Sequence, residues 1–319
     1  MKRTERPVEV QQEGSWRRGR RWLARSLVTV LVVMAQSAHS SAEDDDDPSG
    51  VTNIVRLDES DLRESSGLAV SNRVESRLWT HNDSGKQGKL YAFDRSGELT
   101  GLTEFKSAKM NDWEDVASFV DEGVPRLLVA DSGDNKSERS HIRLYLMDEP
   151  NPDKKTTTKD KETQAIKVTY PDGPRDCEAV GVDVERGLIV LISKTKLPLC
   201  GVYTIPLPRR SEDQDDYEAK LTREGTLPIP MITALDINPR TGDIWIVSYF
   251  HTFCFRCSSR DMSIHRQLSV MPECYELPRW KQIEAVAIDA EDNLWVTSEG
   301  KNPPMGMMTP EALASRRLR

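Results

Sequence analysis

The sequence is poor in histidine and cysteine, with five of each in 319 residues. It offers no Gly-x-Ser-x-Gly motif in a strand-to-helix context, no second pair to match the Cys-x-x-Cys of Cys254 and Cys257, and hardly any window with a helical period. These absences disfavour a zinc centre, a serine-hydrolase nucleophile and a βαβ fold. The 37% of hydrophobic residues and the mean hydropathy of -0.58 suit one large globular domain or two ordinary ones.

An excess of basic residues is missing as well. Residues 1–42 hold eight of the 44 Lys and Arg and three of the 52 Asp and Glu, so the rest of the chain has 36 basic against 49 acidic residues, a net charge of -13. This balance disfavours nucleic acid or an anionic membrane as a partner, and it favours cations.

Residues 1–42 predict a secretory signal peptide. Arg17 to Arg25 is basic, Leu27 to Ala35 is apolar, and small residues lead to Ala42, where we expect cleavage. The apolar run is shorter than the roughly 20 residues of a membrane span, although an uncleaved anchor is the alternative. We therefore expect a periplasmic or extracellular protein, with an acidic disordered linker at 43–50 and no membrane contact beyond the export signal. In an exported protein, five cysteines suggest up to two disulfides or plain buried thiols.

One pattern occurs five times in the chain: a polar residue, an apolar strand, a turn and a second apolar strand. The spacings between the first residues of the copies are close to one another, at 50, 64, 55 and 51 residues. These first residues are Glu64, Glu114, Glu178, Thr233 and Glu284. A repeat of this period indicates an array of small structural units.

Each unit contains about four short strands, which is the size of one propeller blade. The sequence predicts an all-β fold, a single β-propeller over residues 51–308, with five visible four-stranded blades. Six blades are the alternative, because the longest interval contains 151–163, a stretch more simply interpreted as a solvated loop. We expect the strand at 52–57 to complete the last blade, an outer strand at 267–270, a tail at 309–319 with a helical period over 310–317, and a monomer.

The start of the first strand of every blade lies at the central channel, so the four glutamates among the first residues should converge. The ends of the second strands add Asn82, Asp83, Asp131 and Glu299, Asp236 follows Thr233 closely, and Lys194 would offset part of the charge. Carboxylates this close favour a bound cation or raised pKa values. Oxygen ligands with few histidines favour calcium, with magnesium or manganese behind it. The alternative is that these acids only cap strand starts in a solvated channel.

Several motifs resemble those of a family of exported β-propeller proteins whose reaction is not settled. They are Glu64-Ser-Ser-Gly-Leu-Ala69, His81-Asn-Asp-Ser-Gly85 and Asp112-Trp-Glu-Asp-Val-Ala117. The family is distantly similar to SdiA-regulated, phytase-like esterase and gluconolactonase-type propellers, and the resemblance covers most of residues 52–303. It implies a propeller, in several relatives with a calcium ion at the channel. In gluconolactonase-like relatives Glu, Asn and Asp from different blades hold one divalent ion, and the counterparts here would be Glu64, Asn82, Asp131 and Asp236.

Three functions are compatible with these features. The first is an exported propeller that binds a divalent cation, calcium before others, and a small or extracellular ligand at the channel. The second is a metal-dependent hydrolase of lactone, ester or phosphoester type, in which Glu114 or Asp131 would be the catalytic base. The third is a protein-interaction scaffold without catalysis.

Overall fold

The computed structural model describes residues 51–85, 87–106, 110–158, 162–210 and 215–318. All of them belong to one compact unit. The predicted signal peptide and the acidic linker at 43–50 lie outside the described residues. Among these residues, no helix combines the length and the apolar character needed to cross a membrane.

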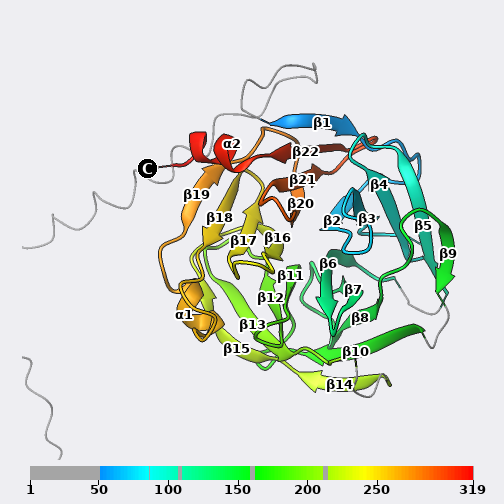
Figure 1. Ribbon diagram of the computed structural model, residues 1–319. Coiled ribbons are helices and arrows are strands. Elements are labelled where there is room, and N and C mark those ends of the chain that lie inside the picture. The colour runs from blue at the N-terminus through cyan, green and yellow to red at the C-terminus, as the bar shows by residue number, and fades with distance from the viewer. Residues whose placement is uncertain (1–50, 86, 107–109, 159–161, 211–214, 319) are drawn as a thin grey trace, which may run out of the picture. The chain divides into compact units, whose positions relative to one another are not determined.

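The described residues form a five-bladed β-propeller, as the repeats predict (Figure 1). The inner strands of the blades, in chain order, are β2 (Ser65–Val70), β6 (Trp113–Asp121), β11 (Cys177–Asp183), β16 (Ile232–Ile237) and β20 (Ile283–Ile288). The second strands are β3 (Arg77–Asn82), β7 (Val124–Asp131), β12 (Leu188–Ser193), β17 (Ile244–Ser248) and β21 (Leu294–Ser298). Each inner strand packs against the inner strands of the two neighbouring blades, with β20 against β2.

The outer half of each blade is less regular. The third strands are β4 (Lys89–Asp94), β8 (Ile142–Asp148), β13 (Cys200–Pro206), β18 (His251–Phe255) and β22 (Pro304–Met308), and the fourth are β5 (Leu99–Phe105), β10 (Thr163–Thr169), β15 (Thr222–Leu227), β19 (Glu273–Glu276) and β1 (Thr52–Arg56). The N-terminal strand β1 pairs with β22, so it is the outer strand of the last blade, as expected. Two blades carry a fifth strand in parallel pairing, β9 (Lys155–Thr158) beside β5 and β14 (Tyr217–Lys220) beside β10.

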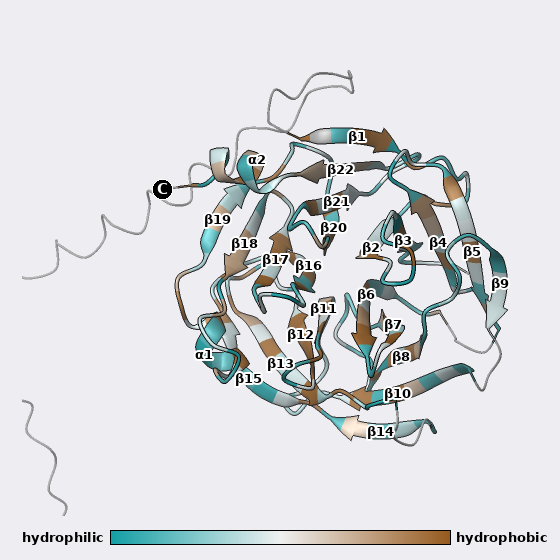
Figure 2. Cartoon of the chain, viewed as in Figure 1, coloured by the Kyte–Doolittle hydropathy of each residue, from teal (hydrophilic) through white to brown (hydrophobic). Residues whose placement is uncertain are grey.

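The core lies between the faces of adjacent blades. Strand β12 is buried along nearly its whole length, and side chains such as Leu144 and Leu191 from neighbouring blades pack in one cluster. Strands β12 and β17 are strongly hydrophobic, whereas the rim strands β9 and β19 are polar (Figure 2). A strand with both faces covered needs a continuous apolar run, which explains the apolar second strand of each repeat.

Two expectations about local structure were wrong. Residues 267–270 do not form a strand, because Ser263 caps a short helix, α1 (Ile264–Leu268), and the outer strand follows at β19. A short apolar run does not distinguish helix from strand. Part of the expected loop at 151–163 is strand β9, which extends the first blade rather than forming a sixth. Of the two alternatives for the cysteines, the second holds: all five are free thiols, with no disulfide among them. The helical period at the C-terminus is confirmed by α2 (Pro310–Ser315).

Candidate functional site

The site is positioned by a β-bulge at the start of every inner strand. In each blade the ladder between the first and second strands skips one residue, which is left without a cross-strand partner. These five residues, which we call the bulge ring, are Ser66, Glu114, Glu178, Thr233 and Glu284. Because all five inner strands run in the same sense around the centre, the bulge ring lies at one end of the channel, the mouth.

The bulge register corrects the alignment of the first repeat. Ser66, not Glu64, is the structural equivalent of Glu114, so the bulge ring has three carboxylates rather than four. Glu64 lies two residues before the bulge, at the position that Asp112 and Asp176 occupy in the next two blades. At the ends of the second strands, Asp83, Lys194 and Glu299 occupy equivalent positions, as predicted. Each comes directly after the second-strand residue that pairs with the residue before the bulge.

Three carboxyl groups from two adjacent blades converge at the mouth. Ligand atoms of Glu114, Asp176 and Glu178 all lie within 4.8 Å of one another, and we call this set the carboxylate cluster. Glu114 and Glu178 are buried, with 5% and 4% of their surfaces exposed. Ser66 donates its hydroxyl to Glu114 Oε2 at 3.3 Å, and a side chain at Gly133 would collide with Glu114 and Asp112. The cluster is thus closely enclosed by the protein.

The cluster carries more negative charge than its surroundings neutralise. Burial, followed by the charges of Glu178, Asp112 and Asp176, raises the pKa of Glu114 well above its ordinary value. Burial also raises the pKa of Glu178 to about 7, although Lys194 opposes that shift. The ammonium group of Lys194 forms an ion pair with Glu178 Oε2. When all three carboxyl groups ionise, their charge exceeds that of Lys194, and a bound cation would replace the protons that the raised pKa values favour.

Two further pairs of acids lie around the mouth. Burial and the neighbouring Glu299 raise the pKa of Glu284 to about 8. Burial and Glu64 raise the pKa of Asp83 to about 7, while Ser84 donates its hydroxyl to Glu64 at 2.7 Å. In each pair the two carboxyl groups share a proton more readily than they ionise together.

The remaining predicted ligands are used by the protein itself. Asn82 Oδ1 accepts from the backbone N–H groups of Arg63 and Glu64 at 2.8 and 3.0 Å, so both lone pairs of this oxygen are engaged. Asp131 forms a 2.9 Å ion pair with Arg139 and also accepts from Asn111. These two residues lie near the mouth but act as structural partners.

Asp236 lies further along β16 and is not part of the carboxylate cluster. Its carboxyl oxygens accept from the backbone N–H groups of Ile237 and Ile288 at 2.8 and 2.7 Å, and burial raises its pKa to about 6. Asp115, which was not predicted as a site residue, is also a structural partner of backbone N–H groups. It is fully buried and accepts from Val180 N at 2.8 Å, which links the second blade to the third.

The sequence analysis also missed Asp112 and Asp176. Both lie in the short segments that precede inner strands, two residues before a bulge glutamate. If the first repeat is aligned on Ser66 instead of Glu64, then Glu64, Asp112 and Asp176 fall at the same position of the repeat. That alignment would have revealed Asp112 and Asp176 as candidates.

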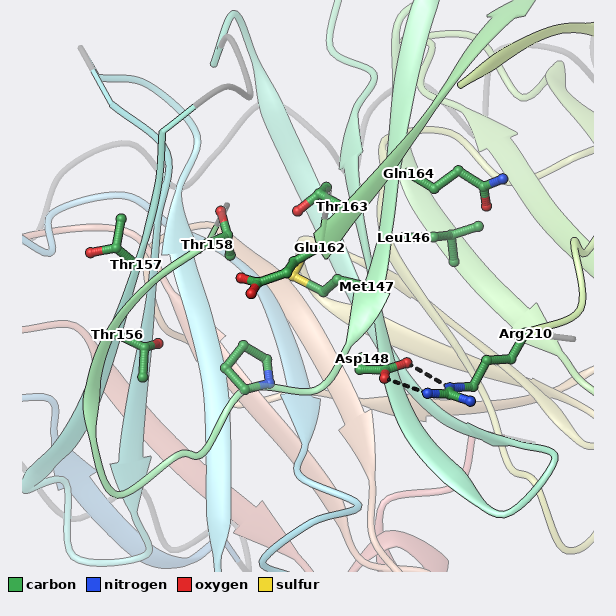
Figure 3. A pocket seen from close by; sticks show the side chains of 11 residues that line it. Leu146, Met147, Asp148, Thr156, Thr157, Thr158, Glu162, Thr163, Gln164 and Arg210 are labelled. Carbon is green, nitrogen blue, oxygen red and sulfur yellow. Dashed lines mark hydrogen bonds and ion pairs between the residues drawn. The ribbon is translucent and has the colours of Figure 1, made fainter. Parts of the chain in front are cut away.

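A hollow of about 590 Å³ adjoins the carboxylate cluster: its lining includes Asp176 of the cluster and Lys194, the ion-pair partner of Glu178. Another, of about 570 Å³, lies at the rim between β8, β9 and β10, where Asp148 and Arg210 are joined by a 3.0 Å ion pair (Figure 3). The lining of the rim hollow contains none of the predicted ligand residues. The hollow at the mouth is therefore the better candidate for a ligand-binding site.

No family model matches the chain, and a search of curated proteins finds no match. Solved structures of other propellers are similar to it in fold. One, of a nidogen/laminin complex, is 13% identical with a TM-score of 0.42, over 80% of this chain and 82% of that one. A gluconolactonase from Xanthomonas campestris is 9% identical with a TM-score of 0.47, over 81% and 89%. Both likenesses are too weak to bear on function, and membership of the exported family stays a prediction.

Proposed function

We propose that this propeller binds a divalent cation, calcium before magnesium or manganese, in the carboxylate cluster, and a small ligand in the hollow beside it. The observation that supports this most strongly is the approach of Glu114, Asp176 and Glu178 to within 4.8 Å of one another, with both glutamates buried and Asp176 partly buried. A cation would remove the mutual repulsion of these groups, and their oxygen atoms are the ligands that calcium prefers. Export through residues 1–42 belongs to the same proposal.

A second function, hydrolysis of a lactone, ester or phosphoester, is favoured by the hollow that shares Asp176 with the cluster. A ligand in this hollow would reach the ion, which would polarise the bond to be broken. Of the two residues predicted as the base, Glu114 suits the role better, because its carboxyl group belongs to the cluster that would hold the ion. Asp131 is held by Arg139 and Asn111.

Calcium should raise the melting temperature of the purified, metal-free protein. At a concentration about a hundred times the dissociation constant, binding adds roughly 2.7 kcal/mol of stability, which for a domain of this size corresponds to a shift of about 5 to 10 °C. Thermal melts with calcium, magnesium or manganese test this, and magnesium should act least because it demands stricter geometry. If neither calcium nor manganese changes the melting temperature, the proposal is wrong, and a scaffold role becomes the better explanation.

A further inference from the structure

The hollow at the mouth is lined by more basic than acidic groups, although the chain as a whole is acidic. Arg175, Lys196 and Arg223 line it together with Lys194, against Asp172 and Asp176. The cluster next to it is made of acidic groups. This local reversal of charge needs an explanation, because basic groups gathered in a concave site attract anions.

The two arginines are fixed in place by one carboxylate. Asp172 pairs with Arg175 at 3.2 Å and with Arg223 at 3.3 Å. It also accepts the hydroxyl of Tyr203 at 3.1 Å, and this hydroxyl in turn accepts from Arg175 Nε at 3.2 Å. Two guanidinium groups share one carboxylate, so the set keeps a net positive charge. Neither Nη1 group has a hydrogen-bond partner among the described residues, so both can donate to a ligand.

Lys196 adds a third positive group at the rim of the hollow. It is exposed and has no ion pair within the described part of the chain. Its neighbours Leu197 and Leu199 expose 62% and 63% of their surfaces, and Phe250, beside the lining residue Tyr249, exposes 59%. The rim therefore offers apolar surface next to the cationic groups, which suits an organic anion better than a free inorganic one.

We propose that this hollow is a subsite for an oxyanion group, phosphate or carboxylate, of an organic small molecule, with Arg175, Lys196 and Arg223 as its donors. That this subsite lies beside an ion rests on the proposed function. In this arrangement the anionic group of the ligand binds at the basic side of the hollow, and its other end lies at Asp176 and Lys194, next to the carboxylate cluster. Without these donors, the acidic mouth would repel such a molecule.

Calorimetric titration with phenyl phosphate, benzoate and phenol tests the subsite, since the three share a ring and differ in charge. We expect at least one anion to bind more tightly than phenol, and the two anions distinguish phosphate from carboxylate as the preferred group. The double variant Lys196→Gln, Arg223→Gln should weaken anion binding by about tenfold or more, because each change removes a hydrogen bond between charged groups. The control Lys220→Gln, an exposed lysine on β14, should bind like the wild type.

Titrations with and without calcium separate this inference from the proposed function. If calcium binds but no anion binds better than phenol, or the double variant binds anions like the wild type, the subsite is wrong and the cation site stands. If anion binding needs Lys196 and Arg223 but calcium never binds, the subsite stands and the cation site is wrong. An unchanged melting temperature of the double variant shows that it is folded.

Discussion

Replacing Glu114 by glutamine is expected to stabilise the metal-free protein and to abolish its response to calcium. Glu114 is buried close to Glu178, Asp112 and Asp176, which raise its pKa. A neutral amide of the same shape removes this repulsion and can still accept from the Ser66 hydroxyl. The same change removes one of three carboxylates from the cluster, and calcium affinity depends steeply on ligand charge. We expect affinity to fall by about a hundredfold or more, measured by calorimetry and thermal melting.

Glu284→Gln is the matched control for this variant. Glu284 occupies the equivalent bulge position, is also buried, and has a like-charged neighbour in Glu299, but it lies outside the carboxylate cluster. The Glu284→Gln substitution should also stabilise the metal-free protein, while leaving calcium binding intact. If the site is catalytic, calcium-dependent turnover of lactones, esters or phosphoesters should vanish in Glu114→Gln and persist in Glu284→Gln. Equal calcium affinity in the two variants would contradict our assignment of the ligands.

The metal-free protein should become less stable as the pH rises from 6.5 to 8, and calcium should remove or reverse this trend. The pKa values of Glu178, Asp83 and Glu284 are raised to about 7, 7 and 8 in the folded state, from ordinary values near 4. The folded protein therefore holds protons that the unfolded chain has released. Their contribution to stability is complete below about pH 4 and is lost as the pH rises through 7 to 8.

The free energy of unfolding is expected to fall by about 3 kcal/mol between pH 6.5 and 8. Each proton that only the folded state holds contributes about 1.4 kcal/mol per pH unit. Urea unfolding at several pH values measures it. The window starts at 6.5 because burial lowers the pKa of His81 to about 4, which gives a slope of the opposite sign at lower pH. Calcium should flatten the slope, since the ion binds the ionised carboxylates. Stability that rises with pH in the metal-free protein would show that these carboxyls do not hold their protons.

The repeats allowed much of the fold to be predicted from sequence, because each inner strand is buried on both sides and must repeat its apolar pattern. The number of blades and the place of β1 followed from this pattern, and helix α2 followed from the helical period over 310–317. Helix α1 and strand β9 did not, since a short polar or apolar run takes the structure that its neighbours impose. Pairing of β9 depends on Lys155–Thr158 meeting β5, more than 50 residues away.

The site was predicted only in part, because its geometry depends on the β-bulge at the start of each inner strand. Glu114, Glu178 and Lys194 were found, since the bulge coincides with the start of each repeat. Glu64 was placed in the wrong ring because its blade has Ser66 at the bulge, and Asp176 was missed because it lies in a connecting segment. The basic hollow combines Arg175 and Lys196 from two connecting segments with Arg223 from β15, and no local sequence pattern joins them.

The most direct test of the cation site is an anomalous difference map from crystals grown with manganese, which can replace calcium at oxygen ligands. We predict a peak at bonding distance, about 2.1 to 2.6 Å, from carboxylate oxygens of Glu114, Asp176 and Glu178 at once. A map without a peak there, or with manganese only at other carboxylates such as Glu284 and Glu299, would contradict the account.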